Sequence, residues 1–274
     1  MLAETPASLA CVYGLVAKTT GFPPLTLTTN ATGGSLAIAI VDAYESSTAL
    51  TDLQSYSSQF GLPAPSASNF TVVFATGTNP GPDPSTTNIR GWELEAALDV
   101  DMAHAMAPSA HIYLVEVASA SNTDLYVAED KATQLVVAAG GGEVTNSWGG
   151  AEFSGETSFD THFAGANVVY FASTGDDPGV EYPSTSSKVV AAGGTSLSRN
   201  LDATFSYRLD TSWVDGGGGP SLFVATPSYQ SAPESAGRIG SFRLQRQLRQ
   251  RGGHLVVYYR RDQCLLAGAG RHRQ

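Results

Sequence analysis

Short apolar runs alternate along this chain with helix-length amphipathic segments, and this alternation limits the folds that are open to it. Six apolar runs have the length of buried strands: 35–44, 70–75, 111–117, 143–148, 167–174 and 188–195. Four segments between them have the length and pattern of helices: 47–60, 92–107, 122–138 and 155–166. Continuous apolar strands separated by helices are typical of a parallel sheet that is covered on both faces. We therefore predict an α/β fold with three layers, in which helices flank a mostly parallel central sheet.

Polar residues stand where several of these predicted strands end. Asp42 follows "AIAIV", Asn146 and Ser147 lie in "EVTNSW", and Asp176 follows "YFASTG". In open α/β sheets, ligands and catalytic groups gather beyond the carboxyl ends of the strands. We expect a functional site at this edge, and its chemistry must be argued from the residues because a fold does not fix a function.

The predicted helix at 92–107 carries four acids within nine positions, with no Lys or Arg between them: Glu93, Glu95, Asp99 and Asp101. Glu95 and Asp99 are four residues apart and share one helix face. Two neighbouring carboxyls titrate as a pair, and one of them keeps its proton to higher pH, which suits a general acid or base. The alternative is a solvated helix face, which is our interpretation of Glu93 and Asp101.

Asp176 and Trp148 are two further candidates at strand ends. Asp176 follows a strand that stops at Ser173 and a turn at Gly175. A protonated carboxyl at that position can donate a hydrogen bond to a developing oxyanion, and the alternative is an ordinary aspartate that caps the turn. Trp148 precedes a Gly-Gly turn. There it either walls a substrate cleft or packs against the core.

Six ordered motifs between about residue 5 and residue 230 resemble the sedolisin family of serine-carboxyl peptidases. They are "TPASLACVYGL", "AIAIVDAY", "WELEAALDVDMAHAMAPSAHIYLVEV", "VTNSWGG", "YFASTGDDPGVEYPSTSSKVVAAGGTSL" and "GGGGPSLFVATPSYQ". The resemblance implies a subtilisin-like fold and a serine-type acid endopeptidase that acts on proteins or peptides. It also implies that Glu95 is the general base and that Asp99 orients it. Asp176 would supply the oxyanion hole, and Asp42 and Trp148 would extend the carboxylate network or line the cleft.

The nucleophile that the resemblance requires is not identified in this chain. In the family it lies near the carboxyl end, in a Gly-Thr-Ser segment that is followed shortly by Pro. The Gly-Thr-Ser of this chain is 194–196, which closes the strand "KVVAAGGTSL" and resembles a structural motif of the family instead. We therefore do not assign Ser196 as the nucleophile, and we expect the chain as it stands to have little or no peptidase activity.

The composition changes sharply after residue 236. Residues 238–274 hold nine of the twelve arginines and a single acid, whereas 1–237 hold 24 acids and six basic residues. We interpret 1–236 as an incomplete peptidase core and 237–274 as a divergent Arg-rich tail. A natural basic tail is one account of it, and a slipped reading frame or a truncated gene is the account that we prefer. The family's calcium loop near the terminus is also missing, so we name no metal ligand and expect no cofactor in this chain.

Charge and hydropathy limit the partners. An acidic body argues against nucleic acid, and no apolar run has the roughly 18 residues that a membrane helix needs. The first residues show no signal peptide, so secretion is expected only of the intact form. We expect a monomer. Cys11 and Cys264 permit one bridge, and nothing in the sequence pairs them.

Two other functions stay open on these residues. One is a non-catalytic pseudoenzyme that holds extended peptides through Trp148 and the Gly-rich segment 215–221. The other is the product of a nonfunctional gene remnant. Acid conditions are expected for the peptidase, because a carboxyl base works near its own pKa and an aspartic acid donates only while it is protonated.

Overall fold

The computed structural model contains one central sheet of six strands, and neighbouring strands are all parallel. It describes residues 4–13, 15, 33–34, 36–85, 91–199 and 207–227. The strand order is β2-β3-β1-β4-β6-β8. The bounds are β1 Ala37–Ala43, β2 Phe70–Phe74, β3 His111–Val117, β4 Gly142–Asn146, β6 Val168–Ser173 and β8 Val189–Ala192. The predicted α/β fold with a mostly parallel sheet is confirmed.

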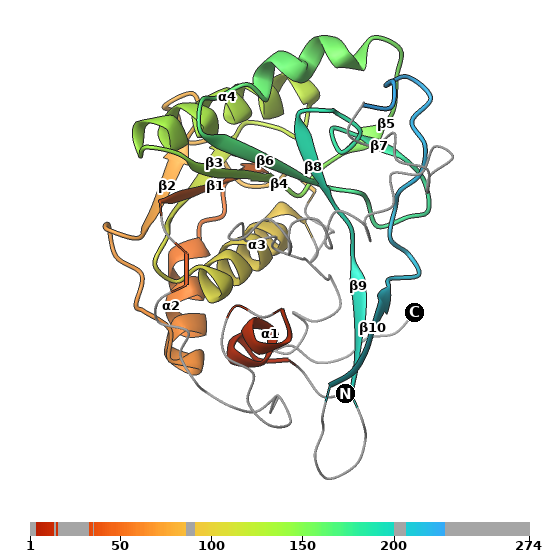
Figure 1. The fold of residues 1–274 in the computed structure, drawn as a ribbon. Helices are drawn as coiled ribbons and strands as arrows, with labels where there is room; N and C mark the ends of the chain where they lie inside the picture. Colours follow the sequence, from red (N-terminus) through yellow and green to blue (C-terminus); the bar gives the residue numbers. More distant parts are fainter. Residues whose placement is uncertain are drawn as a thin grey trace.

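Helices cover both faces of this sheet (Figure 1). The helix α4 (Asn122–Ala138) lies on one face, and α2 (Ala49–Phe60) and α3 (Trp92–Met106) lie on the other. A short helix α1 (Pro6–Val12) packs near α3, and a 3-10 helix, η1 (Glu156–His162), follows β4. The segment 155–166 was predicted as a full helix, and the structure has a shorter 3-10 helix there.

Alternate residues of the central strands point to the two helical layers. On β1, Ile38 and Ile40 lie in the cluster that packs against α2 and α3, whereas Ala39 and Val41 lie in the cluster under α4. The neighbouring strand β3 repeats this, with Ile112 and Leu114 on the α3 side. Because side chains alternate along a strand, residues 42 and 116 must also face α3.

Two small antiparallel pairs lie outside the central sheet. The first joins β5 (Gly150–Ala151) to β7 (Glu181–Tyr182), and the second joins β9 (Thr195–Arg199) to β10 (Tyr207–Ser212). The sequence predicted a single strand over 188–195. The chain instead leaves β8 at Ala192, passes through Gly193 and Gly194, and starts β9.

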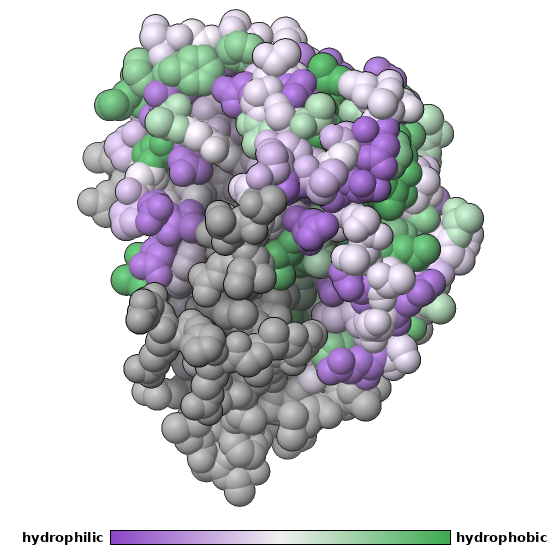
Figure 2. Space-filling view, turned by 180° about the vertical axis from the view of Figure 1, so that it is seen from behind, coloured by the Kyte–Doolittle hydropathy of each residue, from purple (hydrophilic) through white to green (hydrophobic). Residues whose placement is uncertain are grey.

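The face of the molecule that Figure 2 shows carries both hydrophilic and hydrophobic residues. Seen from behind, hydrophilic and hydrophobic residues are interspersed over the part that Figure 2 colours. Among the described residues, no helix combines the length and the apolar character needed to cross a membrane. The predicted boundary at residue 236 and the whole of 237–274, with Cys264, lie outside the described residues.

Candidate active site

The carboxyl edge of the sheet brings together Asp42, Glu95 and Asp99, three of the acids that the sequence singled out. Asp42 lies near the end of β1, and Glu95 and Asp99 lie one turn apart on α3, which covers that face. Asp42 and Asp99 have no exposed surface, whereas Glu95 is half-buried. Glu95 is therefore the member of the group that a solvent molecule or a ligand can reach.

Ser147 fixes the position of the Asp99 carboxyl. It is the first residue after β4, and its hydroxyl donates a hydrogen bond of 3.0 Å to Oδ1 of Asp99. Oδ2 of Asp99 and both carboxyl oxygens of Asp42 have no hydrogen-bond partner among the described residues. Buried polar atoms are usually hydrogen-bonded, so three such oxygens at one strand end mark this edge as a specialised part of the molecule.

Burial and mutual repulsion favour the protonated form of the two buried acids. Burial raises the pKa of Asp42 well above its usual range, and the charges of Glu95 and Glu116 raise it further. Burial also raises the pKa of Asp99, to which the charges of Asp42 and Glu95 add, while the Ser147 hydrogen bond opposes the rise. The three acids are therefore coupled, and a proton lost from one changes the affinity of the others for theirs.

Asp176 lies at the same edge of the sheet, in the turn that follows β6. Its side chain is exposed, and Gly175 before it takes a left-handed backbone with φ of 95°. In the strand order, β6 is two places from β1, so roughly 10 Å of sheet separates the two strand ends. The structure thus places Asp176 on an exposed turn at the same edge of the sheet as Asp42, on the opposite side of β4.

The Gly-rich segment 215–219 is held against this turn. The amide of Gly217 donates to the carbonyl of Gly175 at 3.0 Å, and the amide of Gly218 donates to the carbonyl of Gly179 at 2.6 Å. A Cβ atom at Gly217 would overlap the carbonyl oxygen of Thr174, so only glycine allows this approach. The backbone of the segment therefore runs along the rim of the candidate site.

Glu181 joins the turn to the chain that follows Trp148. Its carboxyl lies so close to Gly149 and Gly175 that a Cβ on either glycine would approach it within 3 Å. Burial raises the pKa of Glu181, and the charges of Asp176 and Asp177 add to this effect. No sequence pattern singles out Glu181, because its place beside Gly175 depends on the pairing of β5 with β7.

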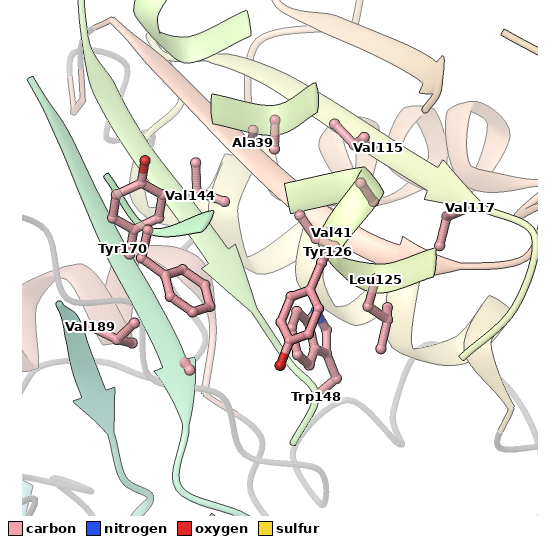
Figure 3. Close-up of a cluster of buried hydrophobic side chains, with 14 of the residues drawn as sticks. Ala39, Val41, Val115, Val117, Leu125, Tyr126, Val144, Trp148, Tyr170 and Val189 are labelled. Carbon is pink, nitrogen blue, oxygen red and sulfur yellow. The ribbon is translucent and has the colours of Figure 1, made fainter. Parts of the chain in front are cut away.

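Trp148 packs on the α4 side of the sheet. It is 7% exposed, and its ring meets that of Tyr126 edge to face at 6.0 Å (Figure 3). Its indole Nε1 has no hydrogen-bond partner among the described residues. These contacts are those of a core side chain, which was one of the two alternatives for this residue. A role in lining a cleft stays a prediction.

The remaining sequence candidates lie away from the acid group or outside the described residues. Ser196 is in β9, where it pairs with Thr211 of β10. Glu93 is exposed, and Asp101 is half-buried, with a pKa that burial and the charge of Asp52 raise to about 7. Within the described ranges, no group of three His, Cys, Asp or Glu residues is arranged to hold a metal ion.

The fold is similar to that of a solved peptidase, Pseudomonas sedolisin, a serine-carboxyl proteinase complexed with two molecules of pseudo-iodotyrostatin. The TM-score is 0.62 and the identity 22%, and the match covers 86% of this chain and 68% of that one. A second solved structure, the prenylagaramide maturation protease PagA, aligns with a TM-score of 0.32 and 16% identity over 66% of this chain and 61% of its own. No family model matches the chain, and no curated protein matches it. The likeness to sedolisin confirms the subtilisin-like α/β fold.

Proposed function

We propose that this chain provides the core of a serine-type endopeptidase of the serine-carboxyl class, which binds peptides across the carboxyl edge of its sheet. The observation that carries the proposal is the pair Glu95 and Asp99 on α3, one half-exposed and one fully buried beside Asp42. The likeness of the fold to that of a serine-carboxyl proteinase supports it. A peptide is the ligand class that this chemistry serves.

The acid pair divides the work of a general base between two carboxyls. Glu95 is the general base, because it is the member that a reacting group can approach. Asp99 orients it and holds the shared proton, because Asp99 is buried and Ser147 fixes its carboxyl. Asp42 extends the network behind the pair, and Trp148 supports the chain that follows β4.

Asp176 is the proposed oxyanion donor. Its side chain is exposed on the turn after β6, where a substrate carbonyl can approach it. It donates a hydrogen bond only while it is protonated, so the site works best under acid conditions. The same conditions suit a carboxyl base such as Glu95. We therefore propose an acid peptidase, secreted in its intact form and acting as a monomer.

The chain lacks an identified nucleophile, so we propose that it cleaves peptides slowly or not at all. Acyl transfer needs an attacking hydroxyl beside the base. The hydroxyl of Ser147 is already donated to Asp99, and Ser196 lies in the hairpin of β9 and β10. We attribute the missing segment to a slipped reading frame or a truncated gene after residue 236.

A second candidate function is peptide binding without turnover. The backbone of 215–219, which two amide hydrogen bonds anchor along the turn that carries Asp176, favours it. Such a segment can pair with an extended peptide through main-chain groups. A nonfunctional gene remnant is the third possibility, and it requires that the chain neither binds nor cleaves peptides.

The test is to incubate the full chain at about pH 4 with a denatured protein substrate, and separately with a fluorescent oligopeptide in an anisotropy titration. We expect saturable binding of the peptide and no cleavage. Glu95→Lys should weaken binding at least about tenfold, which is about 1.4 kcal/mol, because it places a bulky cation at the mouth of the acid group. Glu93→Lys, the same change on the exposed side of the helix, should leave binding unchanged.

Three outcomes would contradict the proposal. Absence of saturable binding would support the gene remnant. Equal binding by the Glu95→Lys and unaltered chains would show that the peptide does not bind at the acid group. Robust cleavage that is lost in Ser196→Ala would show that Ser196 is the nucleophile after all. Thermal unfolding of each variant at the same pH shows whether it has kept its fold.

A further inference from the structure

We propose that Glu116 is a positioning residue of the candidate site, which acts through Asp42 and completes a cluster of four coupled acids with Glu95 and Asp99. The role rests on the proposed function, since it concerns the protonation of the same acid pair. Nothing in the sequence patterns pointed to Glu116, because it lies inside the apolar run "HIYLVEV" and has no special spacing to the other acids.

The strand register brings Glu116 next to Asp42. The parallel pairing of β1 with β3 makes these two residues direct partners. Adjacent strands lie ~4.8 Å apart, and alternation sends both side chains to the face that α3 covers. The apolar stripe of Ile38 and Ile40 on β1 thus ends in one carboxyl, and the matching stripe on β3 ends in another.

The Glu116 carboxyl is buried and anchored by one oxygen. It is 1% exposed, and its Oε1 accepts a hydrogen bond of 2.7 Å from the amide of Ser46, in the loop after β1. Its Oε2 has no partner among the described residues, and the same holds for both oxygens of Asp42. The side chain is therefore fixed in place, with its second oxygen enclosed on the face that holds the other acids.

The charged groups on the elements around Glu116 are acidic. They are its direct partner Asp42 on β1, Glu45 in the loop after β1, Glu93, Glu95, Asp99 and Asp101 on α3, and Asp52 on α2. The strand β2 contributes no titratable group, and none of β1, β2, β3, α2 or α3 contains a Lys or an Arg. The two histidines of these elements, His104 and His111, bond to backbone carbonyls of the chain before β2.

This environment makes ionisation at the inner end of the cluster costly. A second charge beside Asp42 would be both buried and repelled, and burial already raises the pKa of Glu116 to about 7. The first negative charge therefore settles at the outer end, on half-exposed Glu95. Glu116 and Asp42 thus direct the charge to the residue that needs it as a base.

The test is a titration of the side-chain carboxyls by NMR, with ¹³C-labelled aspartate, from about pH 3 to about pH 9. In Glu116→Gln the midpoint of Asp42 should move to lower pH, because its neighbour no longer gains a charge. Asp99 should move the opposite way, because Asp42 then becomes charged earlier. In the Asp42→Asn background, the Glu116→Gln change should no longer move Asp99, which distinguishes action through Asp42 from a direct effect.

A merely structural role for Glu116 predicts different results. If Glu116→Gln folds and leaves the Asp42 midpoint unchanged, the proposal is wrong. If the Asp99 shift is the same with and without Asp42, Glu116 does not act through Asp42. Should Glu116→Gln fail to fold, Glu116→Asp gives the same test, because withdrawing the carboxyl by one methylene group also moves the Asp42 midpoint. Glu93→Gln is the matched control and should move neither midpoint.

These results are independent of the peptide assays. Coupled titration without peptide binding would support the cluster of four acids and refute the proposed function. Peptide binding with an unresponsive Asp42 would support the function and refute the role of Glu116.

Discussion

Replacing Glu129 by Gln should make the protein more stable at neutral pH while leaving it about equally stable in acid. Glu129 lies on α4 and has no exposed surface. Burial raises its pKa from 4.5 to about 8. The protonated side chain is close in shape to the amide of Gln, so the two proteins differ mainly once the carboxyl loses its proton.

The size of the effect follows from the difference between the folded and unfolded pKa of Glu129. A folded value of about 8 against 4.5 in the unfolded chain means that the folded state binds more protons between these limits. The free energy of unfolding is therefore undiminished below about pH 4.5 and falls as the pH rises towards 8. Each unit is worth about 1.36 kcal/mol, so the whole difference corresponds to about 5 kcal/mol, or about 2 kcal/mol at pH 6.

Urea unfolding of the unaltered chain and of Glu129→Gln at about pH 4, 6 and 8 measures this directly. The gap between the two free energies of unfolding should be near zero at the first pH and should widen at each later one. A constant gap would refute the reasoning, because it would mean that Glu129 titrates alike in the folded and unfolded states. Glu93→Gln, which changes an exposed acid, should show no such widening.

Two further changes test the contacts around the site. Ser147→Ala removes the hydroxyl that donates to Asp99, so the titration midpoint of Asp99 should move to higher pH. Urea unfolding should show that the free energy of unfolding falls by about 1 kcal/mol. An unchanged midpoint would contradict the contact between Ser147 and Asp99. Gly217→Ala places a methyl group against the Thr174 carbonyl and should cost about 1–3 kcal/mol. Gly179→Ala meets no atom within 4 Å and should cost less than about 0.5 kcal/mol, so equal losses in the two alanine variants would be evidence against the packing of 215–219.

The layered fold could be predicted from the sequence because the spacing of apolar residues and the lengths of the segments indicate strands and helices. The predicted helix 122–138 has the bounds of α4, and the predicted strand 111–117 has those of β3. The strand predicted at 143–148 ends earlier, at Asn146, which pairs with Val41; Ser147 then leaves the ladder and bonds to Asp99. Apolar character alone cannot show where a strand exchanges its backbone partner for a side-chain contact.

The hairpin of β9 and β10 and the helix α1 were not predicted. The strand β9 reads "TSLSR", which has little apolar character, and α1 is seven residues long, so neither offers a periodic pattern that stands out from a loop. Their formation depends on tertiary contacts, such as that of α1 with α3. Short elements of this kind are determined by what they pack against.

The candidate site could be predicted only where local spacing reports it. Glu95 and Asp99 are one helical turn apart, and Asp42 and Asp176 lie where apolar runs end. Their positions in the sequence were therefore enough to make them candidates. The sequence shows Glu116 only as an acid inside the apolar run 111–117. Its proposed role, however, depends on the register that places it beside Asp42. The register of two parallel strands cannot be predicted from the sequence of either strand alone.

The approach of 215–219 to the turn after β6 has a consequence for the protein's synthesis. A ribosome delivers the chain from its amino end, so Asp42, the acids of α3 and Ser147 have all been made before Gly217 leaves the exit tunnel. The acid cluster can therefore assemble on a nascent chain whose site still lacks one rim. The glycines close that rim later, and only then can the amide of Gly217 donate to the carbonyl of Gly175.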